Sequence, residues 1–134
     1  MPAQLIRSDA LYSGAPYAYA AVAPPGALVF TAGACPIDQQ GHVTAPGDYV
    51  KQAELAVANL RTALLAAGAD FGDVVKTTVY VASAEQSDLV AAWNVVHGAF
   101  GEHDAPSTLL GVAALGYSGQ LVEIEAVAAV QRAF

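Results

Sequence analysis

The stretch 104-DAPSTLLGVAALGYSGQLVEIEAV-127 decides how the chain folds, and its last third is the most informative part. The run LVEIEAV is rich in β-branched apolar residues and predicts a strand over 120–130. Glu123 and Glu125 interrupt this run two residues apart, so both carboxylates lie on one face of the strand. A carboxylate in a half-buried place costs free energy unless it is paired or functional. Because the segment contains no Lys or Arg, we expect the partners of both carboxylates to come from another subunit, a bound molecule or water.

The other elements follow from hydrophobic periodicity and from turn and cap residues, and they predict an α+β domain with two helices on one face of a mainly antiparallel sheet. The first helix is expected over 48–67, opened by Asp48 and closed by Gly68. Ser83 and Gln86 predict a capping box at the start of a second helix, which stops at Gly101. Strands are expected at 28–32, 42–44, 73–83, 107–115 and 120–130, with a tight turn at 38–41 joining the first two and a GYSG loop joining the last two.

The composition indicates one apolar domain that covers part of its surface by assembly. The chain has 134 residues, of which 55% are hydrophobic and 13% are charged, and no repeat or linker divides it. It is long enough to bury a core, so we interpret residues 1–134 as a single domain. No apolar segment reaches the ~18 residues of a spanning helix, and the N-terminus does not look like a signal peptide. We therefore expect a cytoplasmic oligomer with no membrane partner.

Charge and cysteine content exclude two further classes of protein. The net charge is -7, and the five Lys and Arg residues are scattered along the chain, which argues against a nucleic-acid partner. The single cysteine, Cys35, excludes an internal disulfide and a Cys-rich zinc site. The spacing of the three histidines fits no zinc motif.

Six segments in a fixed order resemble the Rid family (reactive intermediate deaminases, also called YjgF-like or endoribonuclease L-PSP-like proteins). Together they run nearly from end to end of the chain. They are GAPYAYAA (14–21), LVFTAGACPID (28–38), NLRTALLAAGA (59–69), DVVKTTVYV (73–81), FGEHDAPSTLLGVAAL (100–115) and VEIEAVA (122–128).

This resemblance implies a chorismate-mutase-like fold with a six-stranded sheet, and a homotrimer whose subunits enclose small-molecule clefts. It also implies hydrolysis of reactive enamines and imines, such as 2-aminoacrylate or 2-iminopropanoate, to ammonia and a 2-keto acid. No metal and no organic cofactor are expected.

One residue of the family pattern is missing. Deaminating Rid proteins carry an Arg that holds the substrate carboxylate through a bidentate contact, and that position falls here on Ser107, or on Pro106 if the register slips by one. The family positions that remain imply Glu123 and Tyr17 as catalytic residues, with Glu123 orienting the attacking water. The same positions imply substrate contacts from Thr108, Ser107 and the backbone at Gly33 and Cys35.

Each of these residues also has an ordinary structural role open to it. Glu123 either handles water or accepts hydrogen bonds at a subunit contact, and a buried tyrosine such as Tyr17 commonly just finds a polar partner. Ser107 and Thr108 either form a small polar pocket in place of the Arg or are ordinary strand hydroxyls. Cys35 is either a thiol in the cleft or a small buried hydrophobe.

Three functions are therefore compared. The first is a homotrimer that hydrolyses imines or enamines which need not carry a carboxylate. The second is a trimer that binds a small ligand or a protein without catalysis, having lost its chemistry with the Arg. The third, ribonuclease activity, is disfavoured by the charge balance. We expect Glu125 to be structural in all three.

Overall fold

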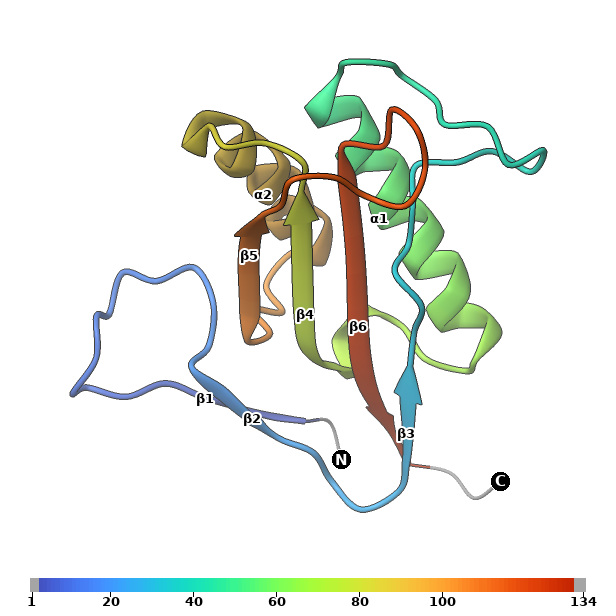
Figure 1. Ribbon diagram of the computed structural model, residues 1–134. Coiled ribbons are helices and arrows are strands. Elements are labelled where there is room, and N and C mark those ends of the chain that lie inside the picture. The colour runs from blue at the N-terminus through green and yellow to red at the C-terminus, as the bar shows by residue number, and fades with distance from the viewer. Residues whose placement is uncertain (1–2, 132–134) are drawn as a thin grey trace.

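The computed structural model describes residues 3–131, which form six strands, two α-helices and one short 3-10 helix (Figure 1). The two helices lie together on one side of the main sheet (Figure 1). In chain order the elements are β1 (Gln4–Ile6), β2 (Ala20–Val22), β3 (Ala27–Phe30), α1 (Tyr49–Ala66), η1 (Phe71–Asp73), β4 (Val74–Val81), α2 (Gln86–Phe100), β5 (Ser107–Gly111) and β6 (Val122–Val130).

The strands form two sheets, which corrects the expected single six-stranded sheet. The main sheet has the order β3-β6-β4-β5, and β1 pairs with β2 in a separate two-stranded sheet. β6 is antiparallel to both of its neighbours, whereas β4 and β5 are parallel and α2 forms the crossover between them. The last two strands are therefore not neighbours, because β4 lies between them. The α+β class with a mainly antiparallel main sheet is confirmed.

The core lies between the helices and one face of the main sheet. Val122, Ile124 and Ala128 of β6 are fully or almost fully buried, and Leu60 and Leu64 of α1 are completely buried. The alternation of β6 thus places its β-branched residues against the helices, as the sequence predicts. The opposite face of β6, which carries Glu123 and Glu125, is only partly covered.

Local capping chemistry fixes the ends of the first helix. The Asp48 carboxylate accepts a hydrogen bond from the amide of Lys51 at 2.9 Å, which satisfies one free donor of the first turn. At the other end Gly68 adopts a φ of 83° just past the helix, a conformation that glycine adopts without penalty. Both predicted ends of this helix are confirmed.

Two local predictions are wrong. The expected capping box does not form, because the Ser83 hydroxyl bonds to the Glu85 amide and the Asp88 carboxylate, and Glu85 is the N-cap of α2. The expected return strand at 42–44 is reduced to one bridge between Ile37 and Val43.

A register shift interrupts the alternation of β4. It lies between Val74 and Lys76, so Val74 is buried against the helices whereas Val75 is only partly buried. Beyond the shift, Val79 and Val81 are fully buried.

The face of the main sheet away from the helices, called here the open face, is unusually apolar for a surface. Leu28 and Phe30 of β3 lie on it, and their exposed fractions are 51% and 72%. Leu110 of β5 is also exposed there. These apolar side chains lie on the two edge strands of the open face, and exposed apolar area is typical of an interaction surface. Within residues 3–131 no helix has the length and apolar character needed to cross a membrane.

Candidate functional site

Glu123 is the centre of a compact polar cluster on β6. One of its carboxylate oxygens, Oε1, accepts hydrogen bonds from Cys35 Sγ at 3.3 Å and from Gln120 Nε2 at 3.2 Å. In the part of the chain that the structure describes, Glu123 makes no ion pair with a Lys, Arg or His. The carboxylate is thus held by two neutral donors, which leaves its negative charge uncompensated.

A single bridge between two distant segments brings Gly33 and Cys35 to this carboxylate. Ala34 exchanges two backbone hydrogen bonds with Ile124, so the residues on either side of Ala34 lie next to Glu123. A Cβ added to Gly33 would stand 2.4 Å from Glu123 Oε2, which is far inside van der Waals contact. Glycine at position 33 is therefore what allows the carboxylate to lie against the chain.

Cys35 is a neutral donor in this cluster. Burial first, and then the hydrogen bond and negative charge of Glu123, together raise the pKa of its thiol from 9.0 to about 11. Cys35 Sγ also contacts the Gly33 carbonyl at 3.4 Å. Since the thiolate is the nucleophilic form of cysteine, a thiol in this state is not a reactive nucleophile near neutral pH.

Glu125 has a different environment although it lies on the same face of β6. Its carboxylate accepts a hydrogen bond from the hydroxyl of Tyr80 on β4, and this contact together with burial raises the pKa of Tyr80. The expectation that both carboxylates find their partners outside the chain is therefore corrected. Glu123 is bonded to Cys35 and Gln120, and Glu125 to Tyr80, because β6 lies beside β4 and beside the segment around Ala34.

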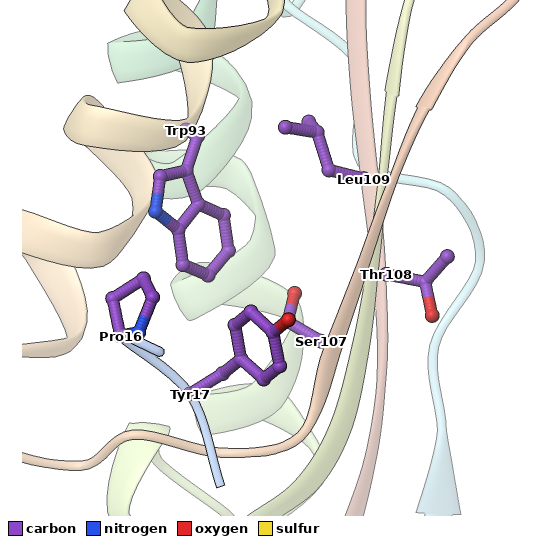
Figure 2. A pocket seen from close by; sticks show the side chains of 6 residues that line it. All are labelled: Pro16, Tyr17, Trp93, Ser107, Thr108 and Leu109. Carbon is purple, nitrogen blue, oxygen red and sulfur yellow. The ribbon is translucent and has the colours of Figure 1, made fainter. Parts of the chain in front are cut away.

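A second group of predicted residues lines a pocket at the edge of the sheet, beside β5. The pocket has a volume of about 470 Å³ and combines two aromatic side chains with the start of β5 (Figure 2). The rings of Tyr17 and Trp93 pack edge to face, with their centroids 6.4 Å apart. The lining residues are Pro16, Tyr17, Trp93, Ser107, Thr108 and Leu109.

Ser107 and Thr108 point to opposite sides of β5 (Figure 2). Ser107 lies on the side of Tyr17 and Trp93, and its hydroxyl is 2.6 Å from that of the buried Thr77. Thr108 points toward the other side, where its hydroxyl accepts a hydrogen bond from Lys76 Nζ at 2.7 Å. Of the two adjacent residues, Ser107 is thus the one whose side chain faces the aromatic walls.

A charged network outside the pocket holds the segment that carries Tyr17. Arg7 donates from Nη1 to the carbonyls of Ala15 and Tyr17 at 2.9 and 3.0 Å, and from Nη2 to Asp104 at 3.0 Å. The other oxygen of Asp104 bonds to His97, whose ring stacks on Trp93. The two aromatic walls are therefore anchored to the same carboxylate.

The six predicted site residues fall into two groups within one chain. Glu123, Gly33 and Cys35 form the cluster on β6, whereas Tyr17, Ser107 and Thr108 lie at the edge pocket, with β4 between the two strands. The sequence analysis missed Gln120 and missed Trp93 as a pocket residue. Gln120 is only 3% exposed, and this burial, which the fold alone decides, makes its amide a partner of Glu123.

The side chains of the described residues do not suggest a metal centre. Among residues 3–131 no group of three or more His, Cys, Asp or Glu side chains is arranged to hold a metal ion. The chemistry available is that of one carboxylate, several hydroxyl groups and backbone amides.

Comparisons with known proteins cover nearly the whole chain. The sequence model of a family described as endoribonuclease L-PSP matches residues 7–130. Protein DfrA of Myxococcus xanthus is 36% identical over 117 residues, which span 84% of this chain and 84% of that protein. The 2-iminobutanoate/2-iminopropanoate deaminase of Mus musculus is 33% identical over 100 residues, which span 75% of this chain and 72% of that protein.

A solved structure gives the same result for the fold. The Rid-family protein YyfB of Yersinia pestis, a protein of unknown function, aligns with a TM-score of 0.88 at 28% sequence identity. The alignment covers 97% of this chain and 100% of that one.

Proposed function

The chain belongs to the Rid family, whose sequence model is described as endoribonuclease L-PSP, and from this premise we propose that it is a homotrimeric hydrolase of reactive imines and enamines. Water adds to the carbon of the C=N bond, that bond breaks, and the products are a carbonyl compound and ammonia. The reaction needs a group that takes a proton from water and returns protons to nitrogen, and it needs neither a metal nor an organic cofactor.

The observation that carries this proposal is the state of Glu123. Its carboxylate is held by Cys35 and Gln120, carries no ion pair among the described residues, and has Oε2 free of any hydrogen bond there. A fixed carboxylate with an unused oxygen suits a general base, which must reach the proton of a bound water at ~2.6–3.2 Å.

Assembly through the open face would join the two groups of site residues. Leu28, Phe30 and Leu110 expose apolar area there, and the Glu123 cluster lies on the same face. In the proposed homotrimer, Glu123 of one subunit faces the edge pocket with Tyr17 and Ser107 of the next. Each cleft would then contain the complete set, which one chain alone keeps apart. The expected result in light scattering is a particle of three times the mass of one chain.

The substrate of this site need not carry a carboxylate. Ser107 stands where the family places its Arg, and Ser107 supplies a neutral hydroxyl. Losing charged hydrogen bonds of ~1.5–3 kcal/mol each lowers the rate on imines of 2-keto acids by roughly 10- to 100-fold or more. Imines made from simple amines lose nothing by this change, so we expect them to be the better substrates.

Ammonia release from imines generated in place tests the proposal. An amino-acid oxidase supplies imines with a carboxylate, an amine oxidase supplies imines without one, and both are compared with the uncatalysed rate. Glu123→Gln should abolish the acceleration, because the amide cannot accept a proton from water. Glu125→Gln is the matched control, since it removes the other carboxylate on the same face, and it should retain turnover.

Two results would count against the proposal. If no imine is hydrolysed faster than in buffer, the alternative of a non-catalytic trimer that binds a small ligand or a protein replaces the proposal. If Glu123→Gln and Glu125→Gln are equally active, the reaction does not depend on Glu123, and its assignment as the base is wrong.

A further inference from the structure

The edge pocket has walls that suit a flat ring. Tyr17 and Trp93 are both partly exposed, and their rings form adjacent edge-to-face walls of a cavity of about 470 Å³ (Figure 2). Pockets of ~300–1,000 Å³ commonly bind small organic molecules. Aromatic rings packed against such walls gain affinity beyond that of area burial alone.

The hydroxyl of Ser107 is available to this pocket as a donor. Thr77 is 3% exposed, and its hydroxyl has Ser107 as its one hydrogen-bond partner among the described residues. If Ser107 donated to Thr77, the proton of Thr77 would be buried without an acceptor, which is costly. Thr77 therefore donates to Ser107, and the proton of Ser107 remains free to bond to a ligand atom on the side of the aromatic walls.

The pocket has no full charge of its own with which to hold an anion. None of its six lining residues is an Asp, Glu, Lys, Arg or His. The nearest cations are engaged elsewhere: Arg7 is paired with Asp104 at 3.0 Å, and Lys76 bonds to Thr108 on the opposite side of β5. A carboxylate moved from water into this pocket would lose hydration without gaining a counter-ion.

The walls are also held in place before any ligand binds. Arg7 fixes the backbone at Tyr17, Asp104 joins Arg7 to His97, and His97 stacks on Trp93 with ring planes 17° apart. A ligand that packs against such walls loses little free energy in ordering them.

We propose that the edge pocket binds an uncharged planar ring that carries a hydrogen-bond acceptor, with the ring against Tyr17 and Trp93 and the acceptor on the Ser107 hydroxyl. If the proposed function holds, the substrates are imines of aromatic aldehydes or ketones, and only this consequence rests on the proposed function. The binding preference itself follows from the pocket of a single chain.

Binding of matched probes tests the preference without any turnover. Benzamide carries the ring and a neutral acceptor, benzoate replaces the acceptor by a charge, and cyclohexanecarboxamide replaces the ring by a saturated one. Trp93 is the single tryptophan of the chain, so its fluorescence reports directly on the pocket, and calorimetry gives the affinity independently. Benzamide should bind about 3- to 10-fold more tightly than cyclohexanecarboxamide and at least ~10-fold more tightly than benzoate.

Substitutions at Ser107 separate the ring from the acceptor. Ser107→Ala should weaken the binding of benzamide by ~3- to 10-fold, because the hydrogen-bond donor is lost. Benzamide should still bind this variant more tightly than cyclohexanecarboxamide does, because the aromatic walls remain. Ser107→Arg should reverse the order, so that benzoate binds more tightly than benzamide. Ser87→Ala is the matched control, since Ser87 is exposed on α2 and its side chain makes no hydrogen bond within residues 3–131, and it should leave all three affinities unchanged.

The outcomes for binding and for turnover are independent. Benzoate binding as tightly as benzamide, or no binding of benzamide at millimolar concentration, would overturn the inference even if the protein hydrolyses imines. Selective binding of benzamide that Ser107→Arg reverses would sustain the inference even if no imine is hydrolysed, and in that case the proposed hydrolase alone fails.

Discussion

Replacing Gly33 by alanine tests whether the position of the Glu123 carboxylate matters. The new Cβ would lie 2.4 Å from Oε2, 2.5 Å from Cδ and 2.8 Å from Cγ of Glu123. Because the φ of Gly33 is not in the left-handed region, the effect is one of space and not of backbone strain. Contacts relax only near ~3.5 Å, so the carboxylate has to retreat by ~1 Å.

The retreat breaks the geometry of the cluster. Hydrogen bonds of 3.3 Å to Cys35 and 3.2 Å to Gln120 have little room to lengthen before they are lost. Each such bond to a charged group contributes ~1.5–3 kcal/mol, and water replaces part of this at a half-exposed carboxylate, so we expect a net loss of ~1–3 kcal/mol in the free energy of unfolding. A displacement of ~1 Å at a catalytic group is expected to lower turnover by ~100-fold.

Three measurements on this variant, each compared with wild type, check the reasoning. They are urea unfolding, imine turnover and the pH dependence of Cys35 alkylation, whose midpoint should fall because the carboxylate has moved away from the thiol. Gly98→Ala is the control, since no atom lies within 4 Å of its added Cβ, and it should stabilise α2 by up to ~1 kcal/mol. A Gly33→Ala protein with wild-type stability, turnover and alkylation profile would falsify the assigned contact between Gly33 and Glu123.

Three further outcomes are expected. The thiol of Cys35, whose pKa is about 11, should react with iodoacetamide only as the pH approaches that value. Glu123→Gln should lower the midpoint pH of this reaction, because it removes a negative charge beside the thiol. An unchanged midpoint, measured by mass spectrometry of the alkylated protein, contradicts this. The bidentate contact of Arg61 lowers the pKa of Asp70. The stabilisation from this ion pair is therefore present above the unfolded-state pKa of ~3.9 and is lost as the pH falls through the lower folded-state pKa. Urea unfolding from pH 7 to pH 2 should show this pH-dependent component in wild type and not in Asp70→Asn. Phe30→Asp places a charge on the open face and should yield a particle with the mass of one chain in light scattering, whereas a variant that still forms the wild-type particle would exclude this face as the interface.

Much of the candidate site was readable from neighbouring residues in the sequence. The two-residue spacing of Glu123 and Glu125 put both carboxylates on the face of β6 that is only partly covered. The same rule applied to Ser107 and Thr108 would have shown that only one of these two adjacent strand residues turns its side chain toward Tyr17 and Trp93. That inference was open to the sequence and was not drawn.

Other features depended on contacts between segments that are far apart in the chain. The register shift that buries Val74 and leaves Val75 partly exposed arises from pairing with β6, and no property of 73–83 alone predicts it. Trp93 had the periodicity of a core residue of α2, and its place in the pocket depends on the segment around Tyr17, which Arg7 and Asp104 hold there.

By itself the sequence determined the α+β class, the ends of α1 and the face on which Glu123 lies, because periodicity and capping act over a few residues. Only the tertiary structure decided that Cys35 and Gln120 hold Glu123, and that Tyr17 and Ser107 lie in a separate pocket beyond β4. The order of the strands explains this division. A strand's sequence pattern sets which face each residue lies on, but the pairing of the strands decides which distant residues become its neighbours.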